Sequence, residues 1–276
     1  MRETIESWLK KSAQKLRNAK IESSQLDAEL ILARVLDTER TTLHAYPNRR
    51  LTRQQVFHAN NWLNKRLNRV PLAYIFHEKE FFGRKFYINE SVLVPRPETE
   101  TLIEVTKELT QNDDKILDIG TGSGIIPATL KLELPKTVEI FASDISLHAL
   151  AVANLNIKRL TSKEIQLFEG NLLDKIPSEI LSQITILTAN LPYVDRNWVN
   201  FEAQNELHHE PQIALYAEKN GLELIFSLLK QAQDLPNLQK IILEADPLQF
   251  EQIEQKAAQL GFQKIKSKDY IIAFSK

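Results

Sequence analysis

The sequence lacks several features that mark particular classes of protein. It contains no Cys, which excludes disulfides, thiolate metal sites and a Cys nucleophile, and which fits a reducing compartment. No apolar run approaches the roughly 18 residues of a membrane span, and the charged N-terminus has no apolar segment typical of a signal peptide. The sequence therefore predicts a cytoplasmic protein that does not bind membranes.

Glycine is also scarce, with seven in 276 residues, and three of them fall at positions 120, 122 and 124. The overall composition, 43% hydrophobic and 26% charged, is ordinary for a soluble globular protein long enough for two domains.

The six His show no metal-ligand spacing, and His208 and His209 are adjacent rather than one helical turn apart. The sequence therefore predicts no metal site.

Charge is unevenly distributed although the net charge is only −1. The first 80 residues are net positive and the remainder is net negative. One stretch holds seven Arg or Lys and no acid: Arg40, Arg49, Arg50, Arg53, Lys65, Arg66 and Arg69. Such a stretch is either a solvated helical face or a docking surface for an acidic protein or a ribonucleoprotein, which would place the chain near the ribosome.

The N-terminal part has a helical pattern. Ser24 and Asp27 have the spacing of a capping box, Thr52 and Gln55 form a second one, and the apolar residues that follow each box recur at helical spacing, as in Leu26, Leu30 and Ala33. We therefore expect residues 1–72 to form a small all-α bundle that recognises the substrate.

A linker made of a hairpin and a Pro-rich segment is expected over residues 73–97. The aromatic segment from Glu80 to Ile88 surrounds one Gly and predicts a β-hairpin, and Pro95-Arg96-Pro97 then stiffens the approach to a helix that begins near Glu98. Arg96 needs a partner, unlike the prolines, so we expect it to contact the substrate.

From Lys115 onward, apolar strand patterns alternate with helical patterns, which predicts an α/β domain over residues 98–276 with an open, mostly parallel, Rossmann-like sheet. Ligands bind beyond the carboxyl ends of such strands. The expected strands are 115–119, 139–144, 165–168, 184–189, 240–245 and 270–274, with helices over 125–134 and 147–160.

The glycines at 120, 122 and 124 follow the first of these strands, where a ligand is expected. Ile125 stands where a dinucleotide fingerprint needs its last Gly, which argues against a pyrophosphate-bearing cofactor. Asp144, at the end of the next strand, is placed to accept both hydroxyls of a ribose, and Asp118 lies where a carboxylate can face a sulfonium or an ammonium.

The segment Asn190-Leu191-Pro192-Tyr193 ends a buried strand. The Asn190 side-chain oxygen and the Leu191 carbonyl can each accept one N–H of a planar amino group, because Pro192 keeps its neighbour extended, and the Tyr193 ring can cover the face of that group. The lone pair of an amino group held this way points at a third position. Together with the glycine turn, this loop favours S-adenosylmethionine as the methyl donor.

These motifs resemble the release-factor glutamine methyltransferases, the PrmC/HemK family of class I methyltransferases. The resemblance covers nearly the whole chain, and its most specific part is the stretch from Leu93 to Glu100, Leu-Val-Pro-Arg-Pro-Glu-Thr-Glu. It implies S-adenosylmethionine-dependent methylation, with S-adenosylhomocysteine as product, of the side-chain amide nitrogen of the Gln in the Gly-Gly-Gln motif of peptide-chain release factors. This activity would support translation termination.

The resemblance also implies a role for each matching residue. The backbone from Gly120 through Thr121, Gly122 and Ser123 to Gly124, with Asp118, would line the cofactor, Asp144 would hold the ribose, and Asn171 and Leu172 would border the adenine. Asn190 would touch both cofactor and substrate, Asn190, Pro192 and Tyr193 would be catalytic, and Leu191 and Arg96 would complete the substrate site. No His or Lys lies in the loop, so no strong general base is expected, and the chain is expected to be a monomer.

Two departures from the family pattern stand out. Leu191 replaces the first Pro of the usual Asn-Pro-Pro-Tyr loop, and Asn171 stands where an acid is more usual. Two alternatives remain open at this stage: an adenine N6 methyltransferase acting on RNA or DNA, whose loop is similar, and a non-catalytic module that retains the cofactor pocket. The acidic catalytic half disfavours nucleic-acid binding.

Overall fold

The computed structural model describes residues 3–161, 164–195 and 206–276. It divides the chain into two compact units, Met1–Phe76 and His77–Lys276, each of which has its own hydrophobic core.

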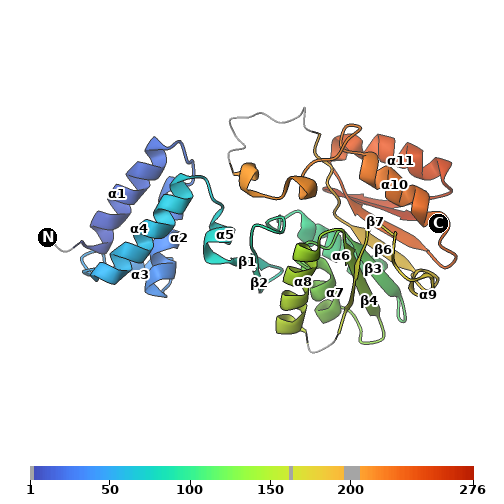
Figure 1. Ribbon diagram of the computed structural model, residues 1–276, viewed down its shortest axis with the longest axis horizontal. Helices are drawn as coiled ribbons and strands as arrows, with labels where there is room; N and C mark the ends of the chain where they lie inside the picture. The colour runs from blue at the N-terminus through green and yellow to red at the C-terminus, as the bar shows by residue number, and fades with distance from the viewer. Residues whose placement is uncertain (1–2, 162–163, 196–205) are drawn as a thin grey trace. The chain divides into compact units, whose positions relative to one another are not determined.

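The first unit is all-α (Figure 1). Its core contains the large buried side chains of Trp8, Leu16, Ile31 and Leu63. Two of its helices begin at capping boxes, formed by Thr4 with Ser7 and, as predicted, by Thr52 with Gln55. The helices are α1 Ile5–Asn18, α2 Ser24–Leu36, α3 Arg40–Ala45, α4 Arg53–Leu67 and α5 Leu72–Phe76.

The expected capping box at the start of α2 was wrong. Ser24 is already helical, and the N-cap residue Ser23 makes no capping bond through its side chain. Asp27 instead lies buried, where its Oδ2 accepts a 2.6 Å hydrogen bond from Nε of Arg66. The predicted apolar stripe was wrong in part for the same reason, because Asp27 turns inward and leaves the side chain of Leu26 41% exposed.

The basic stretch is only partly a free surface. Arg66 is buried against Asp27, Arg40 pairs with Glu29, and Arg69 donates to the carbonyls of Ala19 and Lys20. The stretch therefore contributes much of its charge to holding the bundle together. Its exposed members are Arg49, Arg50, Arg53 and Lys65, together with the half-exposed Arg40.

The second unit opens with the predicted hairpin, formed by β1 Glu78–Phe81 and β2 Arg84–Tyr87, and continues into a seven-stranded sheet. The strand order is β5-β4-β3-β6-β7-β9-β8, parallel except at β9 and β8. The strands are β3 Lys115–Ile119, β4 Glu139–Asp144, β5 Gln166–Glu169, β6 Ile186–Ala189, β7 Lys240–Glu244, β8 Gln263–Lys268 and β9 Ile271–Ser275.

Helices cover both faces of this sheet, so the predicted Rossmann-like α/β class is confirmed (Figure 1). One face carries α6 Thr99–Leu109, α7 Ile125–Glu133 and α8 Leu147–Leu160, and the other carries α10 Glu223–Ala232 and α11 Phe250–Gln259. Short elements in the connections are α9 Ser178–Leu181 and the 3-10 helices Leu207–His209, Gln212–Ala214 and Pro247–Gln249.

Side chains alternate between the two faces of each strand, and this alternation determines which of them meet beneath α6. Leu117, Leu187 and Ile241 belong to the core under α10 and α11. Since side chains alternate along a strand, Asp118, Thr188 and Glu244 point to the opposite face, where α6 lies against β7. The sheet therefore places a row of polar groups under the N-terminus of α6, beside the carboxyl ends of the strands.

Candidate active site

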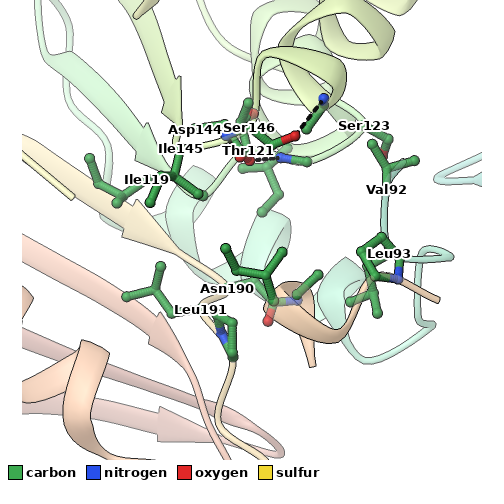
Figure 2. Close-up of a pocket in the computed structure, with 18 of the residues that line it drawn as sticks. Val92, Leu93, Ile119, Thr121, Ser123, Asp144, Ile145, Ser146, Asn190 and Leu191 are labelled. Carbon is green, nitrogen blue, oxygen red and sulfur yellow. Dashed lines mark hydrogen bonds between the residues drawn. The ribbon is translucent and has the colours of Figure 1, made fainter. Parts of the chain in front are cut away.

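A pocket of about 340 Å³ opens beyond the carboxyl ends of β3, β4 and β6, a volume typical of small-molecule sites. Figure 2 shows Asp144 and Ser146 on one wall, Asn190 and Leu191 on the facing wall, and Val92 and Leu93 at a third side. The pocket brings together most of the predicted site residues: Arg96, Gly120, Thr121, Gly122, Ser123, Asp144, Asn171, Leu172, Asn190, Leu191 and Pro192.

The first wall is built by the turn that follows β3 and by the end of β4. The Oδ2 atom of Asp144 accepts a 2.8 Å hydrogen bond from the backbone N–H of Gly122, and its Oδ1 accepts one of 2.9 Å from the N–H of Ser146. These bonds hold the carboxylate at the pocket edge and leave further lone pairs on both oxygens. Burial raises the pKa of Asp144, and the same N–H groups oppose that rise.

The pocket does not include Gly124 among its lining residues. The φ angle of Gly124 is +76°, and a Cβ at this position would lie 2.9 Å from Cα of Ala153 in α8. Gly124 therefore allows α7 to begin against α8 and supports the wall from behind.

Asp118 lies beneath the pocket and does not line it, in contrast to the expected contact with a charged ligand. Its Oδ1 accepts a 2.9 Å hydrogen bond from the hydroxyl of Thr188, whereas its Oδ2 has no partner among the described residues. Complete burial raises the pKa of Asp118 to about 7, and the nearby Asp144 carboxylate adds to the rise. Asp118 is therefore a group of the sheet interior rather than of the pocket surface.

The apolar part of the pocket lies beside Asp144. Ile119, Ile145 and Leu172 line it, and Asn171 stands exposed at its edge after β5. Ile145 remains 49% exposed, although a large apolar side chain normally seeks burial. An apolar lining next to a carboxylate suits a nucleoside.

The facing wall is the Asn190–Tyr193 segment at the end of β6. Asn190 and Pro192 line the pocket, and Leu191 lines it while also packing into the core with 5% exposure. Tyr193 is not among the lining residues, and its hydroxyl donates to Oε1 of Glu244 at 3.4 Å. Burial and the Glu244 carboxylate both raise the pKa of Tyr193.

The backbone of this segment is fixed from a second direction. Nε2 of Gln249 donates to the Tyr193 carbonyl at 2.9 Å and to the Asn220 carbonyl at 2.8 Å. Gly221 packs so closely there that a Cβ would lie 1.9 Å from the Tyr193 carbonyl oxygen. Two separate parts of the chain, the turn at residues 220–221 and Gln249, thus pack against the backbone of the loop.

Two residues of the site were missed at the level of sequence. Glu244 ends β7 with 1% of its surface exposed, and Thr99 begins α6, also 1% exposed, where its Oγ1 accepts a 3.1 Å hydrogen bond from Nδ2 of Asn190. An acid at the carboxyl end of the strand next to β6 was the available signal for Glu244. For Thr99 it was the position inside the Pro-Arg-Pro-Glu-Thr-Glu stretch.

Arg96 lines the pocket and has the partner that its charge requires. Its Nη2 lies 2.7 Å from Oε1 of the buried Glu210, whose Oε2 accepts from the backbone N–H of Val94. Glu210 therefore ties the Pro-rich approach to the segment that precedes Pro211, another lining residue.

Within residues 3–161, 164–195 and 206–276, no cluster of His, Asp and Glu has the arrangement of a metal site. Over the same ranges, no helix is both long and apolar enough to cross a membrane.

Comparison with known proteins matches both parts of the chain to families. Residues 7–76 match the PrmC N-terminal domain and residues 97–233 match the methyltransferase small domain. The release factor glutamine methyltransferase of Aliivibrio fischeri is 31% identical over 97% of this chain and 94% of its own length. The chain belongs to the release factor glutamine methyltransferase family. The family predicted from the motifs is thereby confirmed.

Two other similarities add detail. A bifunctional methyltransferase of Rickettsia bellii is 32% identical over 92% of this chain, and the chain spans about half the length of that relative. Among solved structures, the hMettl16 catalytic domain in complex with an RNA hairpin shares the fold, with a TM-score of 0.57 over 90% of each chain at 15% identity. Membership of the release factor glutamine methyltransferase family makes the pocket between Asp144 and Asn190 the candidate site of methyl transfer.

Proposed function

We propose that this chain transfers a methyl group from S-adenosylmethionine to the side-chain amide nitrogen of the Gln in the Gly-Gly-Gln motif of bacterial peptide-chain release factors, in the cytoplasm. One observation carries the proposal: Asn190 and the carboxylate of Asp144 face one another across a single pocket. An acceptor for an amino group thus stands opposite a group suited to a ribose. The name of the Aliivibrio fischeri relative supports the same substrate.

The residues of the first wall fit the proposed cofactor. Asp144 retains lone pairs for two ribose hydroxyls, Ile145 and Leu172 provide apolar surface for an adenine, and the turn from Gly120 to Ser123 brings backbone close to the pocket. Asn171 is placed to meet the edge of the base. When bound, S-adenosylmethionine supplies a methyl group on a positively charged sulfur.

The second wall then orients the substrate. The Asn190 Oδ1 atom and the Leu191 carbonyl accept the two N–H groups of the glutamine amide, and Pro192 stiffens the loop that carries both acceptors. The amide nitrogen is a poor nucleophile because its lone pair is delocalised. Holding that lone pair in line with the methyl carbon is worth on the order of 7 kcal/mol when the geometry is close to that of attack.

Proton transfer needs no strong base in this scheme. Arg96 and Asp144 are the only residues with readily ionised side chains among the described residues that line the pocket, and each is already held by partners. As the new N–C bond forms and the C–S bond breaks, the amide nitrogen loses one proton to water, and S-adenosylhomocysteine is the product. The chain therefore acts mainly by positioning.

The helical region predicted over residues 1–72 is proposed to recognise the release factor. The exposed cations Arg49, Arg50, Arg53 and Lys65 would suit an acidic partner or the ribosome. We propose that the chain acts as a monomer, because the pocket already holds both groups on which the proposed reaction depends, the Asn190 amide and the Asp144 carboxylate.

Mass spectrometry tests the proposal directly. The protein is incubated with S-adenosylmethionine and a purified bacterial release factor, which is then digested. We expect one added methyl group on the Gln of the Gly-Gly-Gln peptide, and none on a release factor in which that Gln is changed to Glu. An unmodified peptide, from protein shown by calorimetry to bind the cofactor, would overturn the proposed substrate.

A further inference from the structure

Three polar side chains meet at the pocket, on the face of the sheet that α6 covers; Asn190 and Thr99 line the pocket, and Glu244 lies behind them. Asn190 follows β6, Glu244 ends β7 and Thr99 begins α6. The Asn190 Nδ2 atom donates to Thr99 Oγ1 at 3.1 Å, and the Tyr193 hydroxyl donates to Glu244 Oε1 at 3.4 Å. Thr99 and Asn190 also lie close enough to the Glu244 carboxyl to lower its pKa by hydrogen bonding. Glu244 is 1% exposed, and its Oε2 makes no hydrogen bond to any described residue.

The direction of each hydrogen bond in this group follows from the number of available protons. A carboxylate only accepts, and a threonine hydroxyl has one proton to donate. Thr99 Oγ1 accepts from Asn190, so its own proton remains for an acceptor, and the buried Glu244 carboxyl is the acceptor nearby. The end of the Asn190 amide that faces Thr99 must then be the NH2 group, and Oδ1 is the end that remains for other partners.

We infer that Thr99 and Glu244 are positioning residues that fix the orientation of the Asn190 amide and so present Oδ1 to the amino group of the substrate. This inference rests on the proposed function and names two residues that act through Asn190 without taking part in the chemistry. With the amide reversed, the Asn190 NH2 would meet the NH2 of the substrate, and two donors would oppose one another. We call the three residues the Asn190–Thr99–Glu244 relay.

The burial of Glu244 supports this role. A carboxylate in the interior costs free energy, and burial raises the pKa of Glu244 to about 7 against the hydrogen bonds that lower it. Buried ionic groups are often replaceable by apolar ones without loss of stability. A carboxyl group kept at this point, outside the pocket lining but bonded to Tyr193 of the loop that forms it, is explained by the orientation that it imposes.

Substitution of Thr99 gives a matched test. Thr99→Val keeps the shape but removes the hydroxyl, whereas Thr99→Ser keeps the hydroxyl. We expect Thr99→Val to lower kcat for release-factor methylation by about tenfold or more, with binding of S-adenosylhomocysteine within about threefold, and Thr99→Ser to restore kcat to within about threefold of the parent. Glu244→Met, which removes both carboxylate acceptors at this point, is expected to lower kcat similarly. Parent-like turnover of Thr99→Val would overturn the inference.

A second measurement separates this inference from the proposed substrate. The side-chain NH2 signals of Asn190, assigned in a 15N-labelled protein through Asn190→Asp, are recorded without any release factor. We expect slow hydrogen exchange at this NH2 in the parent and in Thr99→Ser, and fast exchange in Thr99→Val. If this pattern holds while no release factor is methylated, the relay stands and the proposed substrate fails. Fast exchange in the parent would overturn the relay whatever the activity.

Discussion

At the scale of single residues, two Asn side chains line the pocket, and we propose a different role for each. Asn190 lies on the wall proposed for the substrate, and Asn171 lies exposed at the edge proposed for the adenine. Asn190 was predicted from the loop motif alone. The Thr99 hydroxyl and the Glu244 carboxylate behind it were not predicted, because their positions in the Pro-rich stretch and at a strand end are weak signals until the fold brings them together.

Exchange of each Asn for Ala should separate binding from transfer. Asn190→Ala is expected to leave S-adenosylhomocysteine affinity within a few fold and to lower methyl transfer at least 100-fold, because the oriented acceptor is lost. Asn171→Ala is expected to weaken cofactor binding and to retain methyl transfer once the cofactor is saturating. Calorimetry and a methylation assay give both quantities, and strong turnover by Asn190→Ala would contradict the assigned role.

The buried Asp118 makes stability depend on pH. Its pKa is about 7 in the folded protein and 3.8 for an ordinary Asp in the unfolded chain, so between these values the folded state holds a proton that the unfolded chain has released. Stability is therefore lost as pH rises through this window. Asp118→Asn cannot titrate, and its stability relative to the parent should rise by about 3 kcal/mol between pH 5 and pH 8 in urea unfolding. Parallel pH profiles would show that Asp118 has an ordinary pKa.

At the scale of elements, the apolar patterns predicted the bounds of helices and strands best where one face of the element is buried. Strand β4 and helix α8 have the predicted bounds, since each has a clear apolar pattern and α8 starts at a side-chain cap on Ser146. Strand β8, Gln263–Lys268, was missed because five of its six residues are exposed and carry no apolar alternation. It is a strand because β9 offers it a partner, which is a tertiary cause.

The buried ion pair between α2 and α4 is the interaction that displaced the predicted capping box. Asp27→Asn leaves the Arg66 guanidinium, 4% exposed at its side chain, without its carboxylate, and should cost about 3–5 kcal/mol in the free energy of unfolding. As a control, Glu3→Gln breaks the more exposed pair with Lys11 and should cost under about 1 kcal/mol. Equal costs in chemical denaturation would show that burial does not decide the strength of these pairs.

At the scale of the whole molecule, two units with separate cores share one chain. Every lining residue of the pocket belongs to His77–Lys276, whereas the Asp27 pair belongs to Met1–Phe76. The motifs identified both parts, but the sequence could not show that three of the seven cations in its basic stretch have internal partners. Only the packing of the bundle reveals them.

Calorimetry should resolve this division. A ligand that binds only the folded form of one unit raises the transition temperature of that unit. S-adenosylhomocysteine is expected to shift one of two unfolding transitions upward by several degrees, and Asp27→Asn to lower only the other. A single transition moved by both changes would show that the two cores unfold together.

Strand β8 has a further consequence for how this protein behaves among its copies. It is an edge of the sheet, and unpaired backbone at an edge invites strands from other chains. Lys264, Lys266 and Lys268 lie along it and pair with Glu254, Glu108 and Glu104, respectively. Glu254 belongs to α11, and Glu108 and Glu104 belong to α6, so these ion pairs lie on both faces of the edge, and a second chain that added there would have to accommodate them. The same polarity that concealed β8 in the sequence thus protects the protein from growing into β-aggregates.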